Sequence, residues 1–444
     1  MHLRHPHSGT ARTIKVAVAG QLARQACMRQ ALPVMSYANT TPSSRVQLLD
    51  TMRGFALAGI VIINAMSIFA VKGSTPAFTV KIPPIDRLLQ DLVLVCVESK
   101  FFTLFSLLFG IGFAIQIASA ERQGTTFLPR ISRRLLALLL FGVLHIALLW
   151  DGDILVIYAV TGALLIAMRT LSQAAARRWI VGLLGVPSFL VLAGLAYTLL
   201  ARLSPSGSAT LVASDASIAT EFGDISSTQQ ILDSSFVASI SERIHSYVAL
   251  SPLLISRIPT VLAMFLLGLQ LGKTGVFRVP EEHRQMLLRC RRLGLSIGFS
   301  LMTAIVLATK FLPATSALLS IIEDQYLAGP ILCIGFASAL TLAYLKRPHR
   351  RIFGHFAAVG QLALTNYLGQ SLVLVILAYG WGFGLASHVS GFAVLGVVAV
   401  LYCGQVALST LWLRRFAYGP LEWAWRCITY WQRVPLVRMA QRQE

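Results

Sequence analysis

The chain has 444 residues, a mean hydropathy of +0.70 and 56% hydrophobic residues, and only 13% of its residues are charged. This composition excludes a soluble globular protein of this length and predicts an integral membrane protein with many spans. The formal net charge of +20 would suit a nucleic-acid partner or a membrane surface, so the distribution of charges along the chain must decide between them.

The six cysteines indicate neither a disulfide framework nor a metal site. No CxxC pair or other metal-ligand spacing occurs among Cys27, Cys96, Cys290, Cys333, Cys403 and Cys427. Five of the six lie in or beside apolar segments, where free cysteine behaves as a small hydrophobic residue. We therefore expect no metal ion and no bound cofactor.

Residues 1–44 differ from the rest of the chain. They are basic, contain no acidic residue, and their apolar run at residues 16–20 is too short for a signal-peptide core. We interpret them as a disordered basic extension. A mitochondrial-like transit peptide has a similar composition, and a start at Met35 would leave only a short leader.

Apolar runs bounded by charge predict about ten transmembrane helices, and hence an all-α polytopic membrane protein. The predicted spans are 54–72, 98–119, 134–150, 153–169, 179–200, 253–272, 293–312, 326–345, 357–379 and 390–413. An amphipathic lead-in at 86–97 precedes the second span. The resulting domains are an N-terminal half at 45–200, a polar outer loop at 201–252, a C-terminal half at 253–430 and a tail at 431–444.

The charges orient these spans. Most of the 38 Lys and Arg residues fall in the N-terminal segment and in every second loop, whereas most of the 18 Asp and Glu residues fall on the other side. By the positive-inside rule, both termini are cytoplasmic. The net charge thus fits topology and contact with anionic lipid, and not a nucleic-acid partner.

The first span begins with charge and contains a polar residue at depth. Asp50 and Arg53 stand at its start, and Asn64 lies roughly 16 Å farther along a helix, past the middle of a bilayer core about 30 Å thick. An ordinary first helix with a positive anchor accounts for these residues. A site that runs across the membrane also accounts for them, because intramembrane polar groups are costly.

Glu98 and Lys100 stand at the predicted outer end of the second span. Interfacial anchoring is the simpler interpretation of this pair, and a contact of Lys100 with substrate is the alternative. Arg257 in the sixth span needs an anionic or carbonyl partner, or access to water, which also makes it a candidate for substrate binding.

His145, in the third span, lies at roughly the same predicted depth as Asn64. The turn at Asp151-Gly152 returns the chain directly into the fourth span, where Asp153 can cap the helix. Hydrogen bonding within the bundle would explain an intramembrane histidine. Because a carboxylate follows about two turns later, a general base or proton relay is the alternative.

The ninth span carries several polar side chains at spacings of three to five residues. They are Thr365, Asn366, Gln370 and Ser371, and this spacing places them on one helical face. Bonds between helices would account for them. A polar cavity in which Asn366 and Gln370 contact a substrate would also account for them.

Six stretches carry a resemblance to a known family. They are residues 48–67, 100–116, 133–162, 264–272, 362–371 and 419–426, which include LLDTMRGFALAGIVIINAMS, LALTNYLGQS and GPLEWAWR. In this order they resemble the YeiB-like family of bacterial inner-membrane proteins, a domain of unknown function. The match covers about residues 45–430 and implies a multi-pass protein of the inner membrane. Gln361 departs from the family pattern, which more often has a basic residue there.

The first span also has a wider resemblance. Leu49-Asp50, Arg53-Gly54 and Asn64 are similar to the first helix of transmembrane acyltransferases, including heparan-glucosaminide acetyltransferase and the acyltransferase-three family. These enzymes use acyl-CoA from one side of the membrane to modify sugars on the other. The resemblance implies that acyl-CoA is a co-substrate, with Arg53, Arg133 and Arg134 near its phosphates.

The same resemblance implies the remaining roles. No histidine lies between Asn64 and Glu98, so His145 would supply the general base from another helix, polarised by Asp153 or Glu98. Asn64, together with Asn366, would donate hydrogen bonds to the oxyanion of the transfer step.

Two other functions remain open at this point. The same polar residues, with nearby glycines, fit a transporter for a small solute. A scaffold or lipid-interacting protein without turnover is the third possibility. In each case the partners are the lipid bilayer and a small-molecule, glycan or lipid ligand, and the sequence leaves the oligomeric state open.

Overall fold

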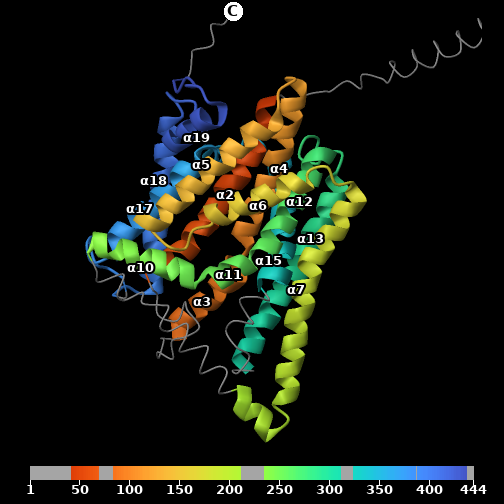
Figure 1. Cartoon of the computed structure of the whole chain (residues 1–444), viewed down its shortest axis with the longest axis vertical. Coiled ribbons are helices and arrows are strands. Elements are labelled where there is room, and N and C mark those ends of the chain that lie inside the picture. Colours follow the sequence, from red (N-terminus) through yellow and green to blue (C-terminus); the bar gives the residue numbers. More distant parts are fainter. Residues whose placement is uncertain (1–41, 70–83, 212–234, 312–323, 387, 438–444) are drawn as a thin grey trace, which may run out of the picture. The chain divides into compact units, whose positions relative to one another are not determined.

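The computed structural model describes residues 42–69, 84–211, 235–311, 324–386 and 388–437 (Figure 1). The predicted extension before residue 42, with Met35, lies outside the described residues. The same holds for residues 212–234 of the predicted outer loop and for the end of the tail. The helices discussed below belong to the unit from Arg45 to Glu444.

The described residues are almost entirely helical, as expected where each backbone polar group must be satisfied within its own segment. An isolated bridge between Phe416 and Val437 is the one strand-like pairing in this part of the chain. The helices are α2 (Pro42–Ile68), α3 (Pro84–Cys96), α4 (Lys100–Arg122), α5 (Phe127–Leu148), α6 (Leu155–Met168), α7 (Gln173–Ala201), α10 (Phe236–Ala249), α11 (Ser251–Ser256), α12 (Ile258–Thr274), α13 (Arg284–Phe311), a π-helix η1 (Asp324–Ala328), α15 (Gly329–Lys346), α16 (Arg351–Gln361), α17 (Ala363–Ala378), α18 (Gly391–Trp412) and α19 (Pro420–Tyr430). The predicted all-α polytopic fold is confirmed.

The number of spans differs from the prediction of about ten. Among the described residues, eight helices are long and apolar enough to cross a membrane, and a ninth span results if the bent pair α16–α17 is counted. The predicted span at 153–169 is α6, whose 14 residues fall short of the roughly 20 that a bilayer requires. The predicted span at 357–379 is broken, because α16 and α17 meet at 81°.

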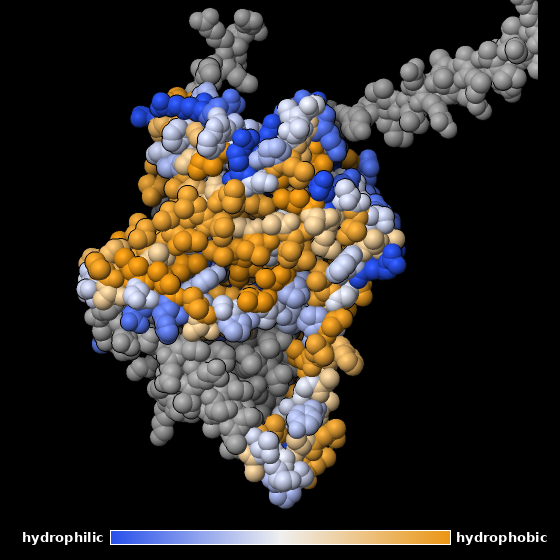
Figure 2. All heavy atoms as spheres, viewed as in Figure 1, coloured by the Kyte–Doolittle hydropathy of each residue, from blue (hydrophilic) through white to orange (hydrophobic). Residues whose placement is uncertain are grey.

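Basic residues gather at one end of the bundle, which we call the basic end. The ends of α6 and α12 meet there, since Lys273 Nζ donates a hydrogen bond of 2.8 Å to the carbonyl of Arg169. The end of α15 meets the start of α2, because the Tyr344 hydroxyl bonds to Gln47 Oε1 at 3.2 Å. Figure 2 shows hydrophilic side chains at this end above a broad apolar band. The membrane orientation of the basic end stays a prediction.

Helices α4 and α12 pack with their backbones nearly in contact. A Cβ atom at Gly110 would overlap the carbonyl oxygen of Phe265, and one at Gly268 would overlap that of Leu107. In membranes, small residues permit this approach, and van der Waals packing then drives helix association. A similar crossing joins α2 to α16, where Gly54 faces the backbone of Phe356. The break between α16 and α17 is therefore packed against the helix that carries Arg53 and Asn64.

We expect Gly110→Ala to lower the stability of the protein by about 1–3 kcal/mol, the usual cost of overpacking. Gly112→Ala is the matched control, because a Cβ there would have only Arg53 Nη2 nearby, at 3.9 Å. Thermal unfolding in detergent checks the pair. Equal unfolding midpoints for the two variants would contradict the proposed tight contact between α4 and α12.

Candidate functional site

His145 and Asp153 form a fully buried pair between α5 and α6. His145 Nδ1 lies 3.0 Å from Asp153 Oδ1, and neither side chain has exposed surface. The second carboxylate oxygen, Oδ2, accepts the backbone N–H of Val156 at 2.8 Å, which caps the start of α6. Asp153 thus has the capping role expected from the sequence and contacts the histidine as well.

The other ring nitrogen of His145, Nε2, is buried and makes no hydrogen bond within the described chain. An ionised carboxylate beside Nδ1 favours the tautomer in which Nδ1 carries the proton, so Nε2 presents its lone pair. Aromatic rings surround the imidazole: its centroid lies 5.2 Å from that of Tyr367 and 6.4 Å from that of Trp150. This arrangement leaves one nitrogen able to accept a proton in a dry environment.

Helix α10 packs against the turn between α5 and α6, beside the His145–Asp153 pair. Arg243, which is fully buried, donates to the carbonyl of Ala147 from Nη2 at 2.8 Å and from Nε at 3.2 Å. A cation at the carboxyl end of α5 also suits the helix dipole. Ser246 of α10 donates to Asp151 Oδ2 at 2.5 Å. Burial raises the pKa of Asp151, which the Ser246 hydrogen bond and the Arg243 charge partly offset. Arg243 was not singled out from the sequence.

Asn64 and Gln370 carry side-chain amides that lack partners. Asn64 Nδ2 and both polar atoms of the fully buried Gln370 make no hydrogen bond among the described residues. Val61 and Ala65, the neighbours of Asn64 on α2, belong to the same packed cluster as Trp150. Trp150, whose ring centroid lies 6.4 Å from that of His145, therefore links the histidine to the cluster beside Asn64.

Three arginines gather at the basic end: Arg53 of α2, Arg134 of α5 and Arg426 of α19. The charges of Arg53 and Arg426 act on both Arg134 and Asp50, so the four groups are neighbours. Arg53 donates to Asp50 Oδ1. The Arg134 guanidinium stacks 3.8 Å from the ring centroid of Trp425. One carboxylate among three guanidinium groups leaves a local excess of positive charge, which suits an anion.

From the sequence we expected Arg53, Arg133 and Arg134 to lie together near the phosphates of acyl-CoA. The structure adds Arg426 to this group of arginines. The Nε atoms of Arg133 and Arg134 are buried without hydrogen-bond partners in the described chain. Arg426 lies far along the chain from the other arginines, and its position depends on how α19 packs.

The other predicted site residues, Glu98, Lys100 and Arg257, lie near the end opposite the basic end and form a separate group. The charge of Glu98 acts on Arg257, so these two residues are neighbours. Lys100 is fully buried, and its Nζ donates to the carbonyl of Leu94 at 2.7 Å. Of the two carboxylates predicted to polarise His145, Asp153 therefore contacts the imidazole, whereas Glu98 is a neighbour of Arg257.

Asn366 takes part in bonding between helices. Its Nδ2 donates to the carbonyl of Val359 and to the hydroxyl of Ser409, both at 3.0 Å. The carbonyl of Asn366 accepts from Gln405 Nε2 at 2.8 Å. These contacts match the interhelical alternative for the polar face, while Gln370 on the same helix retains unpaired polar atoms.

Comparison with known proteins places the chain in a family. The model of "Protein of unknown function (DUF418)" matches residues 271–432. "Uncharacterized protein YxaH" of Bacillus subtilis (strain 168) is 31% identical over 412 residues, which are 89% of this chain and 97% of the relative. The chain belongs to the DUF418 family. "Uncharacterized protein YeiB" of Escherichia coli (strain K12) is 30% identical over 413 residues, which are 89% of this chain and 98% of that protein.

The resemblance to the YeiB-like family is thus confirmed. A third relative, "Uncharacterized 39.9 kDa protein in amylase 3'region" of Bacillus acidopullulyticus, is 27% identical over 409 residues, 88% of this chain and 96% of the relative. No solved structure matches the chain. Full-length similarity to these relatives supports one shared multi-pass membrane architecture.

The region matched by the DUF418 model contains the broken span α16–α17. Glu422 of α19 binds the start of the second of these helices. Glu422 Oε1 accepts the backbone N–H groups of Leu364 at 2.6 Å and Thr365 at 3.0 Å, and its Oε2 accepts the Thr365 hydroxyl at 2.5 Å. A carboxylate from α19 therefore caps the start of α17. The residue is partly exposed, but its carboxyl group is desolvated, and this burial raises the pKa of Glu422 against the lowering effect of its hydrogen bonds. Glu422 was not singled out from the sequence.

We expect Glu422→Ala to destabilise the protein by about 1–3 kcal/mol, because the N–H groups at the start of α17 lose their acceptor. Glu422→Gln should cost much less, since its amide oxygen can still accept them. Thermal unfolding of both variants in detergent checks this. Similar losses in the two variants would contradict the capping role.

The pH dependence of stability provides a second test of the role of Glu422. A carboxyl group with a raised pKa in the folded state contributes most to stability below its unfolded pKa of about 4.3. This contribution falls as the pH rises through the folded pKa. Glu422→Gln should therefore reduce the loss of stability on raising the pH above about 4.

Proposed function

We propose that this protein is an acyltransferase of the bacterial inner membrane that moves an acyl group from acyl-CoA to a hydroxyl group of an envelope glycan or lipid. The observation that carries the proposal is the buried His145–Asp153 pair, whose Nε2 atom is unpartnered in the described chain. General-base catalysis requires such a nitrogen, with its tautomer held by a carboxylate on the other side of the ring.

In this mechanism His145 Nε2 removes the proton of the acceptor hydroxyl as its oxygen attacks the thioester carbonyl carbon. Asp153 stabilises the imidazolium that forms. The tetrahedral intermediate then collapses, the carbon–sulfur bond breaks, and the imidazolium returns the proton to the thiolate of CoA. The products are an ester on the acceptor and free CoA, and His145 is restored.

The negative oxygen of the intermediate needs a hydrogen-bond donor in a water-poor site. Asn64 Nδ2 is a buried donor without a partner among the described residues, and its neighbours on α2 belong to the cluster that contains Trp150, which lies beside His145. Asn366 is less suited to this role, because Val359 and Ser409 already accept from its amide. The Gln370 amide is a further polar contact for the acceptor.

The phosphates of acyl-CoA fit the arginine cluster at the basic end. Arg53, Arg134 and Arg426 supply guanidinium groups that can bind phosphate in bidentate geometry, and one nearby carboxylate, Asp50, only partly balances them. Arg134 lies on the same helix as His145, roughly 16 Å from it along the axis. The donor must therefore carry its acyl group on a long arm, as a CoA thioester does.

A transporter is the second candidate, and the break between α16 and α17 favours it. Discontinuous membrane helices commonly form substrate sites in transporters, with the helix start directed at an anionic group. In this chain the carboxylate of Glu422 binds at the start of α17. That helix terminus is therefore already satisfied from within the protein.

We expect His145→Ala to reduce acyl transfer by about 10²-fold or more, the usual contribution of a general base. Asp153→Asn should also lower transfer strongly, because the amide can still cap α6 but no longer fixes the histidine tautomer. Membrane vesicles containing the full chain are incubated with acetyl-CoA labelled in its acetyl group, and label in lipid and glycan extracts is measured.

His245→Ala is the matched control, because His245 is an exposed histidine on α10. It should leave acetyl transfer unchanged. Transfer by His145→Ala at the rate of the unaltered protein would exclude the general-base role. Solute uptake into proteoliposomes without any acyl transfer would favour the transporter.

We expect Arg53→Ala and Arg426→Ala each to weaken CoA binding by roughly tenfold or more, because each removes charge-assisted hydrogen bonds to phosphate. Arg414→Ala, an exposed arginine outside the cluster, should bind CoA normally. Calorimetric titration of purified protein with CoA measures the affinity. Equal affinities for all three variants would place the donor elsewhere.

A further inference from the structure

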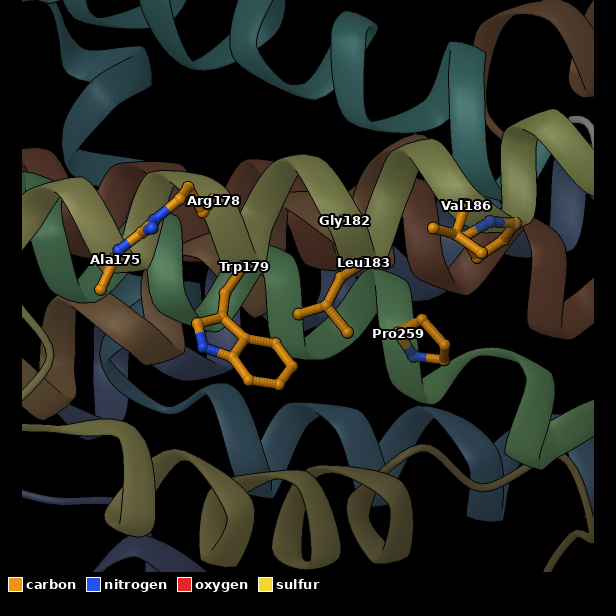
Figure 3. A pocket seen from close by; sticks show the side chains of 8 residues that line it. Ala175, Arg178, Trp179, Gly182, Leu183, Val186 and Pro259 are labelled. Carbon is orange, nitrogen blue, oxygen red and sulfur yellow. The ribbon is translucent and has the colours of Figure 1, made fainter.

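A groove of about 530 Å³ follows the outside of α7, and none of the residues assigned to acyl transfer lines it (Figure 3). Seven of its lining residues lie on α7 and one, Pro259, lies on α12: Ala175, Arg178, Trp179, Gly182, Leu183, Val186, Pro187 and Pro259. Its volume is in the range of small-molecule sites. The groove therefore follows the seam between two helices.

The spacing of the lining residues explains the groove. Residues four apart lie above one another on a helix, so Arg178, Gly182 and Val186 form one row along α7. Gly182 has no side chain, and a Cβ added there would meet no atom within 4 Å. Trp179 and Leu183 belong to the neighbouring row, and Figure 3 shows Leu183 between Trp179 and Pro259. The gap at Gly182, between a cation and an apolar side chain, forms the middle of the groove.

The two ends of the groove differ in chemistry. Arg178 and Trp179 lie near the start of α7, at the basic end, and both are exposed. Tryptophan and arginine in this position are typical of a membrane interface. From Val186 onward the lining is apolar. The distance from Arg178 to Val186 is about 12 Å along the helix, less than half of the bilayer core.

We propose that this groove binds one acyl chain of an anionic phospholipid from the leaflet at the basic end, with the phosphate paired to Arg178. The part of the chain nearest the headgroup lies over Gly182, between Leu183, Val186 and Pro259. Trp179 packs beside the glycerol region. The arrangement matches the amphiphile in both charge and length, since an exposed cation comes first and an apolar channel follows.

Two pairs of variants test this site in the full-length protein. Arg178→Ala removes the cation of the groove, and Arg177→Ala removes an exposed neighbouring cation that does not line it. Gly182→Leu fills the groove, and Gly185→Leu adds the same side chain at an exposed glycine outside it that is equally open. Native mass spectrometry of protein released from nanodiscs measures retained phosphatidylglycerol against phosphatidylcholine.

We expect the unaltered protein to retain phosphatidylglycerol in preference to phosphatidylcholine. Arg178→Ala should reduce that retention about fivefold, the effect of one basic residue at an anionic surface, and Arg177→Ala should not. Gly182→Leu should reduce retention at least as much, while Gly185→Leu leaves it unchanged. If Gly182→Leu does not fold, the arginine pair decides alone.

Two results would overturn the assignment. Equal retention of the two lipids, or equal effects within each pair of variants, would show ordinary boundary lipid only. A dimer that Gly182→Leu disrupts, with unchanged lipid retention, would show that a second copy of the chain occupies the groove.

Discussion

The carboxylate of Asp153 is the constraint on which the interior of this bundle depends. One oxygen contacts His145, and the other caps α6 through the N–H of Val156. In a medium without water, a buried carboxylate or helix terminus left without a partner costs several kcal/mol. The same group therefore fixes the start of one helix and the ring orientation on another. The imidazole of His145 is thus positioned by a residue that also fixes the start of the neighbouring helix.

Polar groups in the membrane interior fall into two classes that burial alone does not separate. The Asn366 amide donates to neighbouring helices beside the break between α16 and α17, and Glu422 of α19, outside the spans, caps the start of α17. His145, Asn64 and Gln370 are at least as buried as Asn366 but retain polar atoms without partners among the described residues. Because unsatisfied groups are costly in hydrocarbon, the second class is where a ligand would contribute most.

The parts of the fold that could be predicted from the sequence rest on local information. Apolar length gave the helices, and the turn at Asp151-Gly152 was enough to predict that His145 and Asp153 come from adjacent helices. The extent of α6 was overestimated, because Ile154 continues its apolar run but lies with Asp153 in the turn before the helix. The break after Gln361 could not be seen, since its residues suit a continuous helix. Its cap is a carboxylate 57 positions later.

The same limit applies to the candidate site. Arg426 joins Arg53 and Arg134 through the packing of α19, and Arg243 reaches the end of α5 from α10. No periodicity within a single segment indicates such partners. The sequence did reveal which residues are unusual for a membrane interior. It did not reveal which of them satisfy one another, because that depends on contacts between distant helices.

The contact between Arg243 and Ala147 has a consequence for how the protein is made. The two residues are 96 positions apart, so the hairpin of α5 and α6 leaves the ribosome well before its partner in α10. Until then the hairpin contains a histidine and a carboxylate but lacks the cation at the end of α5. It also contains a helix of 14 residues, which is short for a bilayer. The end of α5 and the short helix α6 therefore gain this part of their packing only after α10 has been synthesised.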